Sequence, residues 1–433
     1  MSTLEVVKEN AIVFHNNDDV FMIEVVFPCG AINENDENHG ISHFLEHMKF
    51  RRIKDKNEKD TNNILAVSGA TVNAYTTKDQ TGYFIKCNLA EMGDAIDAMV
   101  ALVFDTDFKN NRIAVERKII LEELKMRQAS EGYYHDILST VLESSSLYYN
   151  SIGGTRATIK KITNAELKRY NDYFYCLKNA QFVLSCPKTK TKRMFARLVT
   201  SIDAYRVRVE PPTERKYNTQ MDMCDFRRFE PSVVVQRVRA NQNTVSLSFG
   251  HFGRTHKDHL LVNFIIFILT GSYNSLLKKY IREDKGYTYN VQAVNTSYMH
   301  FGILSVNFST SNDNVCEVIH EIFEVIQKYL FNDKLNPSMF LKFKKDYLKS
   351  LEFRMKNEDN LMDFYSGMCN LDSKTTLRAF MRRVDALTQA ELRVICSSIF
   401  RFDRLGCMIY TKGLSQDAHV DAFKSILLKF KNQ

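Results

Sequence analysis

Apolar and polar residues alternate, or apolar residues gather in short runs, at three places in the first half of the chain. This pattern predicts strands at 20–28, 83–89 and 182–186. Elsewhere in this half the apolar residues recur every three or four positions, which predicts helices at 39–50, 90–104, 113–127, 134–142 and 165–173. Strands and helices mix without a strict alternation. We therefore expect an α+β fold rather than a doubly wound parallel sheet.

Two short segments, one in each half of the chain, carry the same signal for the start of a helix. Residues 162–167 read ITNAEL and residues 387–392 read LTQAEL. Each has a threonine followed three residues later by a glutamate, the pattern of a capping box at a helix N-terminus. An apolar run that predicts a strand follows each box. The two boxes are 225 residues apart, about half of the chain, which predicts a duplicated domain.

The domain organisation follows from this repeat and from the length of 433 residues, which is too long for one compact core. A polar stretch that contains proline and has no period of its own separates the two copies. We expect a first domain over 1–210, a linker over 211–231 and a second, homologous domain over 232–433.

Composition excludes several classes of protein. Hydrophobic residues make up 44% and charged residues 25% of the chain, values that are typical of globular proteins. The longest apolar stretch, 260–269, is too short to cross a bilayer, so no membrane span is predicted. The N-terminus carries no signal or transit pattern, which predicts a cytoplasmic protein, or an organellar one if a presequence has been removed. The net charge of +8 is dispersed, so we predict no nucleic-acid partner.

The strongest chemical signal is the sequence HFLEH at 43–47. On a helix His43 and His47 lie on one face, so both imidazoles can reach one metal ion, and Glu46 projects beside them. Neutral imidazole is a good zinc ligand, and this order inverts the commoner H-E-x-x-H pattern of zinc peptidases. Two histidines on the surface of an amphipathic helix would give the same pattern, so the motif needs a third ligand.

Candidates for the third ligand lie in the helix predicted at 113–127. Glu116 and Glu123 are two turns apart on a shared face, while neighbouring isoleucine and leucine residues form an apolar stripe. Without the histidine motif these glutamates would be interpreted as an ordinary solvated face. Taken alone, the spacing leaves both open as ligands.

Three segments resemble, in order and in spacing, landmarks of the insulinase or pitrilysin-like metallopeptidases, a family that includes the mitochondrial processing peptidases. They are HGISHFLEHMKF at 39–50, SGATVNAYTTKDQTGYF at 68–84 and AVERKIILEEL at 114–124. Two further segments, ILTGSYNSLL at 268–277 and IREDKGYTY at 281–289, resemble the signature of the family's second domain. The resemblance therefore covers nearly the whole chain.

The resemblance implies one zinc ion per chain, bound by His43, His47 and Glu123, with Glu46 as the general base. It implies that Glu116 supports the site without binding the metal. No inverted motif occurs in the second copy, where Gly271 and Ser272 lie near the equivalent position.

For the substrate, the resemblance implies that Asn73 and Ala74 lie on a strand that pairs with an extended peptide. It also implies that Arg282 and Tyr289 contact the substrate near the zinc. The expected activity is that of a zinc-dependent endopeptidase that cleaves extended peptides or unfolded protein segments in an enclosed chamber.

In length the chain resembles the family's short form, in which one chain carries two homologous domains, each a mostly antiparallel sheet covered by helices. Two such chains build one chamber, so a homodimer or a heterodimer with a related subunit is implied. The alternative is a noncatalytic subunit of the same fold that binds peptides or supports an assembly. The sequence KFRR at 49–52 departs from the turn that is usual after the motif, so the entry to the site can differ.

Overall fold

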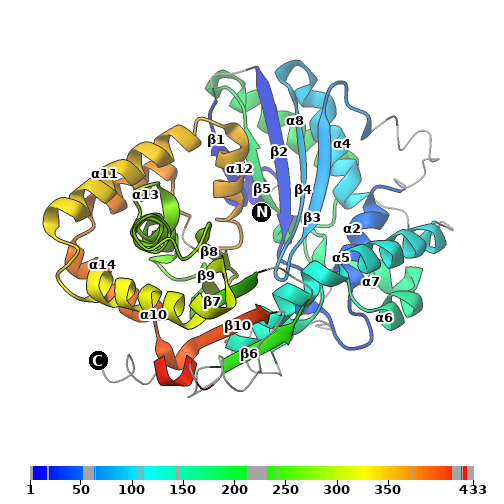
Figure 1. The fold of residues 1–433 in the computed structure, drawn as a ribbon. Coiled ribbons are helices and arrows are strands. Elements are labelled where there is room, and N and C mark those ends of the chain that lie inside the picture. Colours follow the sequence, from blue (N-terminus) through cyan, green and yellow to red (C-terminus); the bar gives the residue numbers. More distant parts are fainter. Residues whose placement is uncertain are drawn as a thin grey trace. The chain divides into compact units, whose positions relative to one another are not determined.

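The computed structural model describes residues 3–16, 19–51, 65–105, 112–142, 146–211, 232–238, 242–372 and 374–411, and in addition residues 63, 108, 421 and 423–426. The described chain forms two compact units (Figure 1). The first contains the described parts of 1–129, 150–221 and 357–374. The second contains those of 130–149, 222–356 and 375–433.

The first unit is built on a five-stranded sheet with the order β1-β5-β2-β4-β3. Its strands are β1 (Ala11–Phe14), β2 (Val20–Phe27), β3 (Thr71–Thr76), β4 (Thr81–Asn88) and β5 (Gln181–Ser185). β1 and β5 are parallel, and the other neighbouring pairs are antiparallel. β3 lies at one edge of this sheet, with β4 on one side and no described strand on the other.

The second unit repeats this plan with the order β6-β10-β7-β9-β8. Its strands are β6 (Ser232–Arg237), β7 (Asn243–Phe252), β8 (Val291–Ser297), β9 (Phe301–Thr310) and β10 (Leu405–Thr411). Again one pair at the edge, β6 and β10, is parallel and the others are antiparallel. The repeated topology confirms the predicted α+β fold with two homologous, mostly antiparallel sheets.

Helices cover one face of the first sheet. Alternate residues of β2 point to this face, and Phe21, Ile23, Val25 and Phe27 are fully buried there. The helices of the first unit are α1 (Thr3–Glu9), α2 (Ile41–Lys49), α4 (Met92–Phe104), the first part of α5 (Ile113–Val141), α6 (Arg156–Lys161), α7 (Asn164–Phe174), α8 (Thr191–Ala204) and α12 (Glu358–Ser366). α4 packs on β2 and β4 and is apolar almost all round, because α8 covers its outer side.

The opposite face of the first sheet is covered by α12, which comes from the second half of the sequence (Figure 1). Met22 and Val26 of β2 pack there against Met362 and Cys369. Because β2 is buried on both faces, its sequence VFMIEVVF is apolar almost throughout. The polar exception, Glu24, accepts a hydrogen bond from Tyr75 Oη (2.7 Å) and another from Ser366 Oγ.

The second unit shows the reciprocal arrangement. Its helices are α9 (Val262–Ile266), α10 (Val315–Ile326), α11 (Pro337–Arg354), α13 (Leu377–Ala386) and α14 (Gln389–Ile399), with π-helices η7 (Phe267–Gly271), η8 (Lys278–Asp284) and η10 (Gln327–Phe331). Residues 130–149 of the first half pack on its sheet, where Tyr148 and Phe301 stack edge to face with centroids 4.4 Å apart. A shift of 225 residues takes 130–149 onto 355–374, so each copy contributes the same segment to the other copy's unit.

Both predicted capping boxes are present. Thr163 precedes α7, its N–H donates to Glu166 (2.7 Å), and its hydroxyl accepts from the Glu166 N–H. Thr388 and Glu391 form the same pair before α14, with a corresponding distance of 2.8 Å. The repeat detected in the sequence thus reflects equal helix starts in the two units.

The helices predicted at 113–127 and 134–142 are wrong as separate elements, because α5 continues through both as one helix of 29 residues. The segment between them contains Gly132, but one glycine costs a helix only about 1 kcal/mol, so α5 continues through it. The compact units do not follow the domain boundaries expected at 210 and 232. The range 130–149 belongs to the second unit, and 357–374 belongs to the first. The expected linker, 211–231, lies almost wholly outside the described residues.

Among the described residues, no helix has both the length and the apolar character that a membrane span requires.

The short 3-10 helices are η1 (Ala31–Asn33), η2 (Leu89–Glu91), η3 (Leu147–Tyr149), η4 (Leu177–Asn179), η5 (Lys188–Lys190), η6 (His259–Leu261), η9 (Asn312–Asn314) and η11 (Phe402–Arg404).

Candidate metal centre

Helix α2 carries the HFLEH sequence, and local interactions explain where this helix begins. Gly40 precedes it with a φ of 90°, a left-handed conformation that side chains disfavour. The Glu34 carboxylate accepts backbone N–H bonds from Gly40 (2.7 Å) and Ser42 (2.9 Å). These bonds satisfy donors that the first turn of a helix leaves unpaired, so the start of α2 is held in place.

The two histidines of α2 lie one turn apart, above an apolar helix face. Fully buried residues anchor that face, namely Ile41, Phe44, Leu45 and Met48. The rings of His43 and His47 are 4.7 Å apart between centroids and inclined by 74°. Burial, helped by the nearby charges of His47 and Arg127, lowers the pKa of His43 to about 3. His43 is therefore neutral, the form of imidazole that binds metal ions.

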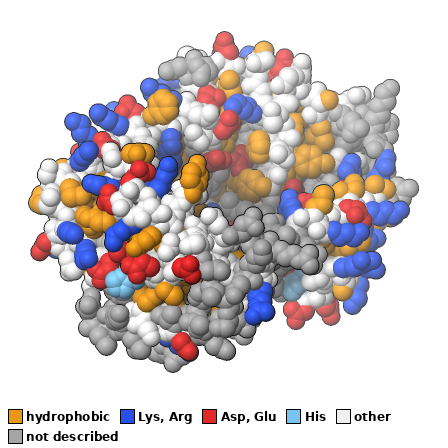
Figure 2. Space-filling model, viewed as in Figure 1, with side chains coloured by type: hydrophobic (Ala, Val, Ile, Leu, Met, Phe, Trp, Pro, Cys, Tyr) orange, Lys and Arg blue, Asp and Glu red, His pale blue; other side chains and the backbone are white. Residues whose placement is uncertain are grey.

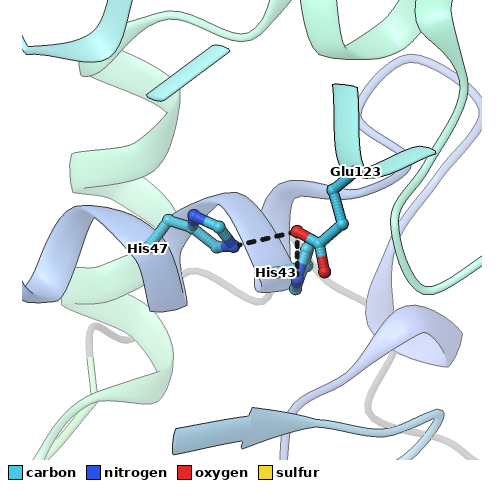
Figure 3. A group of neighbouring side chains, drawn as sticks. All are labelled: His43, His47 and Glu123. Atoms are coloured by element: carbon cyan, nitrogen blue, oxygen red, sulfur yellow. Dashed lines mark ion pairs between the residues drawn. The ribbon is translucent and has the colours of Figure 1, made fainter. Parts of the chain in front are cut away.

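Glu123 of α5 completes a group of three side chains (Figure 3). Its Oε2 lies 3.4 Å from His47 Nε2 and 3.7 Å from His43 Nε2. Two ligands that are each about 2.1 Å from a tetrahedral zinc ion are about 3.4 Å apart, so this spacing suits one ion. Two neutral imidazoles and a carboxylate also form a suitable donor set for zinc. Within the described part of the chain, no other His, Cys, Asp and Glu residues form such a group.

Glu116 contacts the other side of the His47 ring. Its Oε2 lies 3.2 Å from His47 Nδ1, and its Oε1 is paired with the Arg51 guanidinium. Burial acts to raise the pKa of Glu116, but the hydrogen bond from His47 and the charge of Arg51 outweigh it and hold the pKa below its usual value. An ionised Glu116 accepts a hydrogen bond from His47 Nδ1, which leaves Nε2 as the ring nitrogen that faces Glu123.

Glu46 projects from the same helix and is bonded to the edge strand. Its Oε2 accepts a hydrogen bond from Thr76 Oγ1, the last residue of β3, at 2.6 Å. Burial raises the pKa of Glu46, while the Thr76 hydrogen bond and the neighbouring His47 act against this rise. A carboxylate with a raised pKa is suited to taking up a proton and returning it.

Sequence reasoning gave no role to three residues at this site. Arg127 pairs with Glu123 Oε1 (2.6 Å), on the oxygen that does not face the histidines, and Arg51 pairs with Glu116. Arg127 follows its partner Glu123 by four positions on α5, a spacing that could have revealed it, whereas the partner of Arg51 lies 65 residues away in the sequence. Thr76 has no such local signal, because 30 residues separate it from Glu46.

A hollow of about 600 Å³ lies on α5 next to the group of His43, His47 and Glu123. It is lined by Lys118, Ile119, Glu122, Glu123, Met126 and Arg127. Where α5 lies in Figure 1, Figure 2 shows hydrophobic side chains among Lys and Arg side chains. The carboxylate of Glu123 thus borders an exposed surface that is partly apolar and partly charged, with both signs present.

The substrate residues implied by the resemblance lie in two places. Asn73 and Ala74 are on β3 at the sheet edge, and the Ala74 N–H donates to Asn73 Oδ1 (2.9 Å). Arg282 and Tyr289 are in the second unit, where the guanidinium carbon lies 5.5 Å from the ring centroid, a cation–π distance. Tyr289 is 85% exposed. These two residues are therefore neighbours on the surface of the second unit.

The second copy has a different local structure near the equivalent position. α9 passes into the π-helix η7, which ends at Gly271 before Ser272. A side chain at Gly271 would collide with the ring of Phe267. This segment carries no histidine or glutamate, so it contributes nothing to a metal centre.

Comparison with known proteins identifies the family. The profile described as insulinase, peptidase family M16, matches residues 11–155, a range that contains His43, His47 and Glu123. The profile described as the peptidase M16 inactive domain matches residues 161–337. The chain belongs to peptidase family M16. The predicted family is thus confirmed, by one M16 profile over 11–155 and a second over 161–337.

This M16 chain is similar in sequence to several named proteins. It is 26% identical over 333 residues to the uncharacterized zinc protease YmxG of Bacillus subtilis, covering 74% of the chain and 75% of that protein. It is 29% identical over 152 residues to a probable mitochondrial-processing peptidase subunit beta of Arabidopsis thaliana, covering 34% and 28%. It is 27% identical over 158 residues to cytochrome b-c1 complex subunit 1 of Bos taurus, covering 35% and 32%.

Solved structures agree on the fold. A protease from Helicobacter pylori superposes with a TM-score of 0.80 at 16% identity, covering 93% of this M16 chain and 96% of that chain. A peptidase M16 inactive domain from Pseudomonas fluorescens gives 0.79 at 17% identity, covering 94% and 96%. Both chains are matched over almost their whole length, so the two-unit architecture belongs to the fold.

Proposed function

We propose that the chain is a zinc-dependent endopeptidase that cleaves extended peptides or unfolded protein segments. The observation that supports this most directly is the meeting of His43, His47 and Glu123 from two helices, with Glu46 beside them. Membership of family M16 and relatives named as zinc proteases support a peptidase activity in general. The roles of the individual residues are part of the proposal.

His43, His47 and Glu123 would hold one zinc ion per chain. Bound there, zinc would activate a water molecule and polarise the carbonyl of the scissile peptide bond. Glu116 keeps the proton of His47 on Nδ1, which leaves Nε2 as the ligand atom. Arg127 holds Oε1 of Glu123, so Oε2 is the oxygen directed to the histidines.

Glu46 would act as the general base and then as the acid. It takes a proton from the attacking water as oxygen bonds to the peptide carbon, and returns that proton to the nitrogen as the C–N bond breaks. Its raised pKa suits both steps, because a stronger base takes the proton more readily at neutral pH.

The substrate would pair with β3. An extended peptide can add to the edge of a sheet through main-chain hydrogen bonds, with little dependence on its sequence. Such a peptide would compete with Asn73 Oδ1 for the N–H of Ala74. The hollow on α5 beside Glu123 would receive substrate side chains.

A noncatalytic subunit that binds peptides or supports an assembly is the alternative. Two observations favour it, namely the similarity to a cytochrome b-c1 complex subunit and the match of residues 161–337 to the profile described as the M16 inactive domain. The set of His43, Glu46, His47 and Glu123 favours the enzyme, because a binding subunit needs neither the ligands nor the base.

Metal analysis combined with peptide cleavage tests the proposal. The purified chain should contain about one zinc ion per chain and cleave a mixed peptide library, and a chelator should abolish cleavage until zinc is restored. A chain that binds zinc yet cleaves no peptide, alone or with a related subunit, would favour the alternative.

A further inference from the structure

We propose that Thr76 is a positioning residue that couples the substrate-binding strand to the general base. The inference rests on the proposed function, since it assumes that Glu46 is the base and that β3 pairs with the substrate. It starts from one contact, the 2.6 Å hydrogen bond from Thr76 Oγ1 to Glu46 Oε2.

Thr76 is held firmly at the end of β3. Its partner across the sheet is Thr81, which is fully buried and donates to the carbonyl oxygen of Cys29 (2.8 Å). The turn that follows is closed by the Thr77 N–H donating to the Gln80 carbonyl oxygen (2.8 Å), and the Ala31 N–H bonds to the carbonyl oxygen of Thr77. Because this backbone is held by hydrogen bonds on both sides, the Thr76 hydroxyl can hold a bound side chain in one orientation.

That group is the carboxylate of Glu46, and Thr76 is the donor to it among the described residues. A glutamate side chain has three rotatable bonds, so a carboxylate without a donor would sample several orientations. Thr76 fixes Oε2 and leaves Oε1 as the oxygen that takes the proton. A misplaced base slows proton transfer even when zinc and substrate are both bound.

The position of Thr76 on β3 adds a link to the substrate. Asn73 and Ala74, which would meet the substrate backbone, lie three and two residues before Thr76 on the same strand. A peptide that pairs with this edge stabilises the strand that also carries the hydroxyl on Glu46. Strand pairing would therefore help to order the base, and its effect should appear in kcat rather than in KM.

Three substitutions test the inference in the full chain with zinc bound. Thr76→Val keeps the shape but removes the donor, Thr76→Ser keeps the donor, and Thr200→Val makes the same change at an exposed position of α8. We expect kcat for peptide cleavage to fall roughly tenfold or more in Thr76→Val. KM and zinc content should stay within about twofold, and Thr76→Ser and Thr200→Val should remain near wild type.

The metal-free chain provides a readout that does not depend on activity. Unfolding of Thr76→Val, Glu46→Ala and the double variant should be non-additive, because both single changes remove the same hydrogen bond. Additive effects would overturn the inference. So would a normal kcat, a loss of zinc or a rise in KM alone in Thr76→Val when the wild type is active.

A wild-type chain that cleaves no peptide would overturn the proposed function, and this inference with it. That result is distinct from an active wild type whose Thr76→Val variant is unaffected, which would overturn the inference alone.

Discussion

At His47 two carboxylates meet one imidazole from opposite sides. Glu123 faces Nε2 at 3.4 Å and Glu116 faces Nδ1 at 3.2 Å. In the sequence both glutamates lie on the same face of a helix, and their spacing gives them equal access to a metal. The different contacts arise because α5 crosses α2 with His47 between the two glutamates. Nδ1 therefore contacts Glu116, while Nε2 faces the proposed ligand Glu123.

Removal of the base alone should separate metal binding from catalysis. We expect Glu46→Gln to keep zinc, because all three proposed ligands remain, and to lose activity by roughly 100-fold or more. Zinc content and hydrolysis of a peptide, measured on the same preparation, check this. Near-normal turnover by the variant would remove Glu46 from the mechanism.

The two glutamates of α5 should differ in their effect on zinc binding. Glu123→Gln should weaken it more than Glu116→Gln, because the first change removes a proposed ligand while the second removes a support for His47, which typically costs 10- to 100-fold in affinity. Competition with a chromogenic chelator measures both constants. Glu122→Gln, at an exposed neighbouring position, is the control. The reverse order would move the ligand to Glu116.

At the scale of elements, β2 shows how burial on both faces leaves one polar residue with an unusual environment. Glu24 lies under α12 and is bonded to Tyr75 of β3 and Ser366 of α12. Burial raises its pKa to about 7, against the effect of the two hydrogen bonds. Glu24 therefore links two elements: β3, the strand that also contacts Glu46, and α12, a helix from the other half of the sequence.

The raised pKa of Glu24 predicts how stability depends on pH. A carboxyl that is less acidic in the folded chain stabilises it below its ordinary pKa of 4.5, and this contribution is lost as pH rises through about 7. The stability advantage of wild type over Glu24→Gln should therefore shrink by about 2 to 3 kcal/mol from pH 5 to pH 8.

Urea unfolding of both chains across that range measures the effect, because the other titrating groups cancel in the difference. Glu37→Gln, at an exposed position, should show no such trend. A constant difference between wild type and Glu24→Gln would mean that Glu24 has an ordinary pKa.

At the scale of the molecule, each half of the sequence completes the other. The described parts of 130–149 and 357–374 belong to the compact units of the opposite copies, so neither half contains all the segments of its own unit. Among the described residues, the group of His43, His47 and Glu123 that could hold a metal ion lies in the first unit, while Arg282 and Tyr289 lie in the second. The resemblance to the short form of the family implies that two chains meet to make one chamber.

If the chamber is shared, Arg282 and Tyr289 should act on the zinc site of the partner chain. A mixture of a Glu46→Gln chain with an Arg282→Ala chain should then be more active than either parent. One site of the mixed dimer keeps its base and receives an intact Arg282 from the partner. Peptide cleavage before and after subunit exchange measures this gain.

Subunit exchange in the mixture must be verified independently, for example with chains of different mass. A mixture that exchanges its subunits and shows no gain in activity would contradict the shared site. A strictly monomeric active enzyme would do so more directly.

The sequence by itself determined the features that depend on neighbours along the chain. The strands at 20–28 and 83–89, the two capping boxes and the face shared by His43 and His47 all follow from local periodicity or local hydrogen bonds. Only the tertiary structure decided which partners distant residues meet. Thr76 bonds to Glu46, Glu116 and Glu123 separate at His47, and two segments pack in the opposite copies. Contacts between distant residues depend on how whole elements pack, and no short pattern in one sequence records that packing.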